Sequence, residues 1–183
     1  MSDADARVTG SGGRAVDEVA PARSARRPRL PLTARNALLT AHIVFSVGLL
    51  GDSAGYLAVA IRTSTLDDPA LVRDSVKTLN MFSLVFGIPL SFAALLTGLA
   101  LGLGTRWGVF RYPWVVAKLV LIVTVLLVGG LVIAPASNQM LNGEGDRTAR
   151  LIAAAAYDVV ALAAATSLGV FKPGRSFRPR RAR

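Results

Sequence analysis

Four long apolar runs divide the chain, and short polar segments separate them. They cover about residues 37–61, 79–103, 113–134 and 151–171. Each is close to the roughly 20 residues that an α-helix needs to cross about 30 Å of hydrocarbon. None alternates between apolar and polar positions as the strands of a membrane barrel do. The pattern therefore predicts an all-α protein, a four-helix transmembrane bundle over residues 33–173.

Helix-capping residues refine these boundaries. Asp68 followed by Pro69 is a favourable helix start, and apolar residues at helical spacing continue from there into the second run. We therefore expect the second helix to begin near residue 69, outside the membrane. Pro113 is predicted to open the third helix and Pro135 to close it.

Four further sites carry helix signals. Thr33 is predicted to cap the first helix and Asp146 the fourth, which the sequence Lys-Pro-Gly from residue 172 should end. Pro89 lies inside the second run and should kink it.

The two ends of the chain are polar. Residues 1–32 form a predicted disordered cytoplasmic tail with no early apolar run, so a secretory signal is not indicated. Residues 174–183 form a basic cytoplasmic tail. The alanine-rich N-terminal tail and the arginine-rich ends resemble those of actinobacterial proteins.

The distribution of positive charge predicts the orientation. The net charge is +10, and fifteen Lys and Arg residues lie in residues 1–35, 104–112 and 172–183, against five on the opposite side. Positive residues concentrate on the cytoplasmic side of membrane proteins. We therefore expect a bacterial plasma-membrane protein with both termini in the cytoplasm, its basic tails near anionic lipids. The tails lack any nucleic-acid-binding motif, so no nucleic acid is expected.

The amino-acid composition excludes several classes of chemistry. Hydrophobic residues make up 52% of the chain and charged residues only 17%, which is unlike a soluble domain. The chain has no Cys and one His, which excludes disulfides, thiolate catalysis and a multi-histidine metal site within one copy. No motif of a soluble enzyme is present, and the sequence leaves open whether the protein is an enzyme.

Four ionisable residues fall inside the apolar runs: His42, Asp52, Lys118 and Asp158. Such groups are costly in a membrane and are candidates for function. His42 and Lys118 each lie seven residues from a boundary arginine, which places both roughly 10 Å inside the cytoplasmic boundary. Small residues near Gly98 and Ala165 should share that layer, which suggests a slot for a flat ligand. The two acids lie in the outer half at similar depth.

A structural role is an alternative for every one of these residues. The imidazole of His42 can simply satisfy a backbone carbonyl or a serine, and Lys118 can extend towards the headgroups. Asp52 and Asp158 can be protonated structural groups rather than proton carriers. Two glycine pairs, at 51 and 55 and at 98 and 102, are typical of close helix packing and of oligomer contacts.

Several segments resemble a family of small bacterial integral membrane proteins of unknown function. They are residues 39–51 (LTAHIVFSVGLLG), 68–73 (DPALVR), 96–99 (LTGL), 105–118 (TRWGVFRYPWVVAK) and the Lys172-Pro173 pair. The family is distantly similar to copper-resistance D-type proteins and to membrane haem proteins that oxidise protoporphyrinogen. The latter use a His in the first span and a Lys in the third, which match His42 and Lys118.

That resemblance implies haem b or a related porphyrin as the cofactor. His42 would be the axial ligand to the haem iron, and Lys118 would hold a propionate or act as the candidate catalytic residue. A single His excludes bis-histidine ligation from one chain, and a copper role fits worse because clustered Met, His and Cys are lacking. Two other functions stay open: a non-catalytic scaffold or partner subunit that forms homo-oligomers, and a small proton-coupled transporter that uses Asp52 and Asp158.

Overall fold

The computed structural model describes residues 31–104 and 112–171, and all regular structure in these two ranges is helical. The elements are α1 (Leu32–Thr63), α2 (Pro69–Phe82), the π-helical turn η1 (Ser83–Gly87), α3 (Ile88–Gly104), α4 (Pro113–Val128), the π-helical turn η2 (Gly129–Ile133), α5 (Ala134–Leu141) and α6 (Thr148–Phe171). The predicted all-α class is confirmed. The two predicted tails, apart from residues 31 and 32, and the Lys172-Pro173 exit lie outside the described residues.

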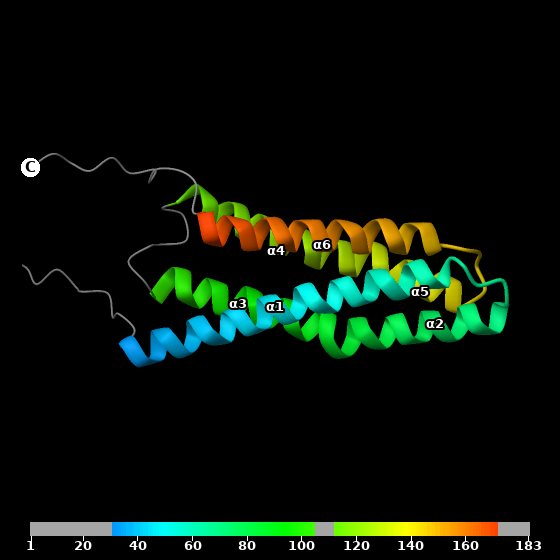
Figure 1. The fold of residues 1–183 in the computed structure, drawn as a ribbon, viewed down its shortest axis with the longest axis horizontal. Helices are drawn as coiled ribbons and strands as arrows, with labels where there is room; N and C mark the ends of the chain where they lie inside the picture. Colours follow the sequence, from blue (N-terminus) through cyan, green and yellow to red (C-terminus); the bar gives the residue numbers. More distant parts are fainter. Residues whose placement is uncertain (1–30, 105–111, 172–183) are drawn as a thin grey trace, which may run out of the picture.

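These elements form four long helices. The first and fourth are α1 and α6, the second runs through α2, η1 and α3, and the third runs through α4, η2 and α5. All four are long and apolar enough to cross a membrane. They lie side by side, with the start of α1 and the end of α6 at the same end of the bundle (Figure 1). We call this the terminal end, and the opposite end, with connections 64–68 and 142–147, the loop end.

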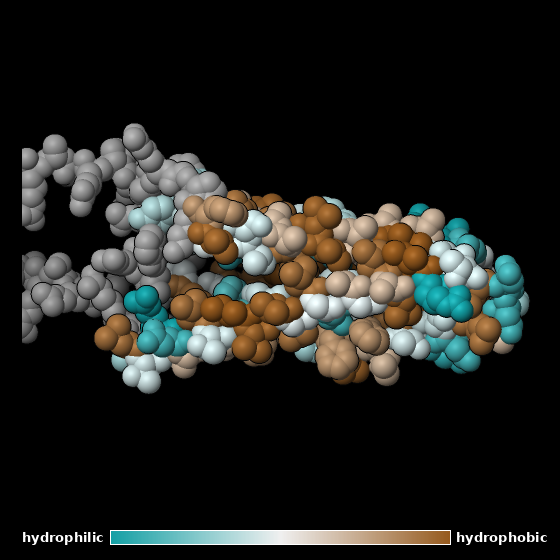
Figure 2. Space-filling model, viewed as in Figure 1, coloured by the Kyte–Doolittle hydropathy of each residue, from teal (hydrophilic) through white to brown (hydrophobic). Residues whose placement is uncertain are grey.

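Large apolar side chains cover the outside of the bundle. Leu131 is 72% exposed, Val160 67% and Leu96 62%. Figure 2 shows apolar residues along the flank of the bundle and polar residues at the loop end. Water would disfavour so much exposed apolar surface, whereas hydrocarbon accommodates it. The surface is therefore compatible with a multi-pass membrane protein.

The first helix holds the bundle together. It packs against α6, α3 and α2, while α4 packs mainly against α6. The buried core lies towards the loop end, where Tyr56, Leu79 and Leu151 join small residues of α5 and α6. A second, smaller cluster around Leu49 and Leu162 lies near the middle of the bundle.

The two prolines inside spans do not end their helices, and the prediction that Pro135 closes the third helix is wrong. That helix continues through Pro135 to Leu141. A π-helical turn ends two residues before each proline, at Gly87 before Pro89 and at Ile133 before Pro135. A proline has no N–H for the carbonyl one turn earlier, and local π-helical geometry rearranges the neighbouring hydrogen bonds so that the helix continues.

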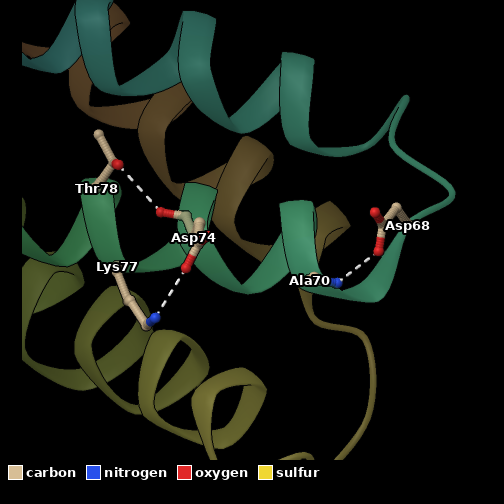
Figure 3. Close-up of polar contacts among 5 residues, drawn as sticks. All are labelled: Asp68, Ala70, Asp74, Lys77 and Thr78. Atoms are coloured by element: carbon tan, nitrogen blue, oxygen red, sulfur yellow. Dashed lines mark hydrogen bonds and ion pairs between the residues drawn. The ribbon is translucent and has the colours of Figure 1, made fainter.

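The helix starts follow the predicted caps in two cases out of three. The carboxylate of Asp68 accepts a hydrogen bond from the Ala70 amide at 2.8 Å, so α2 begins at Pro69 as expected (Figure 3). Further along α2, the exposed Asp74 pairs with Lys77 at 2.8 Å (Figure 3). The prediction for Thr33 is wrong: α1 begins at Leu32 after Pro31, so Thr33 lies inside the helix.

The third cap is the carboxylate of Asp146 before α6. It accepts hydrogen bonds from the Thr148 amide at 2.7 Å and from the Thr148 hydroxyl at 2.6 Å. These bonds, the hydroxyl first, hold the pKa of Asp146 below its ordinary value. The charged form of this carboxylate therefore stabilises the fold.

We expect Asp146→Ala to lower the free energy of unfolding by about 1 kcal/mol at neutral pH, because the first turn of α6 loses its acceptor. The cap acts fully above the ordinary carboxyl pKa of about 4 and is lost as the pH falls through the lowered value. Unfolding of the purified protein in detergent at several pH values measures both effects. Glu144→Ala, in the same connection, is the control, and an equal loss in both variants would contradict the cap.

Candidate functional site

The imidazole of His42 joins α1 to α3. Its Nδ1 lies 3.0 Å from the Thr97 hydroxyl oxygen. The Thr97 hydroxyl donates its one proton to the backbone carbonyl of Ala93 at 2.6 Å, and also contacts that of Ala94. The hydroxyl oxygen can then only accept from Nδ1. This arrangement assigns the imidazole proton to Nδ1 and leaves the lone pair on Nε2.

The glycine at position 98 makes room for this ring. A Cβ atom at Gly98 would lie 3.1 Å from Cε1 of His42 and 3.8 Å from Nε2. A contact at 3.1 Å is tighter than side chains normally make, so an alanine here would push the imidazole away. Gly51, from the other predicted packing pair, faces open space instead, with no atom of the described residues within 4 Å of its Cβ position.

The side chain of Lys118 extends from α4 to α6. Its Nζ lies 2.9 Å from the position that a Cβ of Gly169 would occupy. The sequence placed this layer at Ala165, so the ammonium group reaches one helical turn closer to the terminal end. A long side chain that extends towards the polar boundary explains this difference. Lys118 makes no hydrogen bond or ion pair with residues 31–104 or 112–171, and its positive charge acts on His42.

The terminal half of the bundle, where these two side chains lie, is loosely packed. Residues 32–48, 95–104, 113–124 and 163–171 include no fully buried side chain. By contrast, the middle and the loop half of the four helices together contain fourteen buried apolar residues. Figure 1 shows α6 well separated from α1 and α3 at the terminal end. The helices therefore form no buried core around His42.

The two membrane acids lie in the other half of the bundle. Asp158 of α6 is only 7% exposed. Asp52 of α1 is half-buried, and its Oδ2 lies 3.3 Å from where a Cβ of Gly87 in η1 would be. One oxygen of each carboxyl group is buried with no hydrogen-bond partner, and neither pairs with the other. Lys118 does not pair with Asp158.

Two hydroxyl groups lie in the same loop half of the bundle. Tyr56 is 4% exposed and Ser137 of α5 is 1% exposed. The two side chains interact, yet neither oxygen has a partner with ordinary hydrogen-bond geometry. Neither residue was predicted from the sequence to be part of a site. Helical spacing places Tyr56 on the face of His42, but no sequence signal marks Ser137, because a lone serine in an apolar helix is common.

The chemistry available in the described ranges is limited. They contain no group of three or more His, Cys, Asp or Glu side chains that could hold a metal ion. One imidazole with a free nitrogen can still supply a single ligand to a metal that a cofactor already holds. Scans against protein-family models, curated proteins and solved structures found no match for this chain.

We expect Gly98→Ala to weaken the contact between His42 and Thr97, because the new methyl carbon would lie 3.1 Å from Cε1 and the imidazole has to move. The nitrogen-15 NMR signals of His42 should then lose the pattern of a single fixed tautomer. NMR in detergent measures this effect. Gly51→Ala is the matched control, since nothing lies within 4 Å of its Cβ position. Unchanged His42 signals in Gly98→Ala would contradict this packing.

Proposed function

We propose that this chain is a multi-pass bacterial membrane protein that binds a porphyrin, with haem b as the first candidate, between the terminal halves of its helices. His42 would be the axial ligand to the iron, and Lys118 would pair with a propionate. The observation that carries the proposal is the hydrogen bond between His42 Nδ1 and Thr97, which leaves Nε2 with a free lone pair.

The fixed tautomer supports ligation for a general reason. Metal-bound histidines commonly bind through one ring nitrogen while the other donates a hydrogen bond that orients the ring. The bond to Thr97 orients His42 in this manner before any ligand arrives. Nδ1 makes the bond to Thr97, and the ring also interacts with the backbone carbonyl of Ala94. The lone pair on Nε2 is the one that a metal would take.

The surroundings of His42 support a large flat ligand. No fully buried side chain seals the terminal half, so the helices can separate there without losing a packed core. Lys118 brings a positive charge to the same half and lacks a carboxylate partner among the residues described. An ammonium in a partly desolvated place favours an anionic group, and a propionate provides one.

Haem bound here would supply electron transfer or oxidation chemistry, and the protein would tune it through ligation and access. The residues of the chain would have two tasks: His42 would bind the iron, and Lys118 would pair with a propionate.

We expect haem added to the purified apoprotein in detergent to give a sharpened and shifted Soret band at one equivalent per chain. The shift should be lost in His42→Ala, and Thr97→Val should weaken binding about 10-fold or more, because the orienting acceptor is removed. Absorbance titration measures both. Thr124→Val, on α4, is the control. A wild-type chain whose titration matches free haem in detergent would refute the proposal.

We also propose that both termini face the cytoplasm, as the concentration of Lys and Arg at the terminal end suggests. The natural chain has no Cys, so single cysteines report orientation cleanly. A membrane-impermeant maleimide should label Glu144→Cys on intact cells or spheroplasts but label Ser11→Cys only after lysis. The reverse pattern would show the opposite orientation.

A further inference from the structure

Four buried oxygen atoms without partners lie in the loop half of the bundle: Asp52 Oδ1, Tyr56 Oη, Ser137 Oγ and Asp158 Oδ1. In the two described ranges, these are the only buried side-chain polar atoms that lack a hydrogen bond. They come from α1, α5 and α6. Tyr56, Ser137 and Asp158 are each more than nine-tenths buried. The unsatisfied polar groups are therefore concentrated in one region.

The phenol of Tyr56 connects the members of this group. Both carboxyl groups act on it electrostatically, and the Ser137 hydroxyl also interacts with it. Asp52 and Asp158 are therefore both near Tyr56, and their buried Oδ1 atoms share no hydrogen bond. No Lys, Arg or His of the described ranges pairs with either acid.

Such a group is unstable without a further partner. A buried polar atom with no hydrogen bond costs about 1–3 kcal/mol, and more if it is charged. Natural bundles rarely leave several such atoms together, and acids at membrane depth usually face a pathway or a bound ion. The shared property of the four atoms is that each is an oxygen able to accept or to coordinate. A cation is the kind of partner that such oxygens have in common.

The composition of the group identifies the kind of cation. Oxygen ligands prefer hard cations, whereas soft metals require sulfur or imidazole. Calcium binds six to eight oxygens, usually with several carboxylates, and this group has only two carboxyl groups with a phenol between them. We propose that Asp52, Tyr56, Ser137 and Asp158 form an occluded site for a small monovalent cation, Na⁺ or H⁺.

The π-helical turn η1 contributes to the site. Gly87 ends this turn, and the absence of a side chain there lets Oδ2 of Asp52 approach to 3.3 Å from the missing Cβ position. The titratable groups that face the site are Asp52 and Tyr56 of α1 and Asp158 of α6. The site lies ten residues along α1 from His42, about 15 Å away, and does not depend on porphyrin binding.

The test is thermal unfolding of the full chain in detergent at constant ionic strength, with choline chloride replaced stepwise by NaCl. A sodium site raises the midpoint by about 4 °C for each tenfold increase in Na⁺ above its dissociation constant. The dependence should be weaker at pH 6 than at pH 8, because protons compete for the carboxylates. It should vanish in Asp158→Asn and persist in Asp74→Asn, which removes an exposed acid of α2.

Infrared spectroscopy of the wild-type protein separates the two cations. A proton site gives no sodium dependence, but its carboxylic C=O band titrates with pH and disappears in Asp158→Asn. A sodium site shows loss of that band on addition of NaCl at fixed pH. The proposal is overturned if the C=O band changes with neither NaCl nor pH and the unfolding midpoint does not depend on Na⁺. Asp158 would then be a permanently protonated structural group.

Discussion

Hydrocarbon offers no hydrogen bonds, and this constraint governs the whole molecule. Every backbone amide in a span has to find its partner within the chain, so the long apolar runs can only be helices. The same constraint explains why π-helical turns precede Pro89 and Pro135 and why hydroxyls such as Thr97, Thr166 and Ser167 bond to carbonyls of their own helices. Polar groups in the spans that lack a partner within the chain are therefore candidates for ligand binding.

The bundle departs from this rule in two different ways at its two ends. Near the terminal end, His42 bonds to Thr97 through Nδ1, and Lys118 has no acceptor in the described ranges. Near the loop end, four oxygens are buried without donors. The first arrangement suits an anionic ligand with a metal centre, and the second suits a small cation. The packing of the two halves also differs. The loop half contains the main buried core, and the helices of the terminal half bury no side chain fully.

The central position of α1 links these regions. It carries His42 towards α3 and, ten residues later, Asp52 and Tyr56 towards η1, α5 and α6. Because α1 is one uninterrupted helix, a shift at one end would move side chains at the other. The two prolines lie in the second and third helices, where the π-helical turns provide the adaptable backbone.

Hydropathy and capping residues determined much of this protein from the sequence alone. Four helices, the start of the second at Pro69 and the cap at Asp146 follow from local rules, because each depends on neighbours within one turn. The end of the third helix and the place of the Lys118 amine required the tertiary structure, since a π-helical turn and a long flexible side chain both respond to surroundings. Only the tertiary structure identified Ser137 as part of a candidate site. A single serine in an apolar helix is common in sequences, and this one belongs to the site because α5 packs it beside Tyr56, more than eighty residues earlier in the chain.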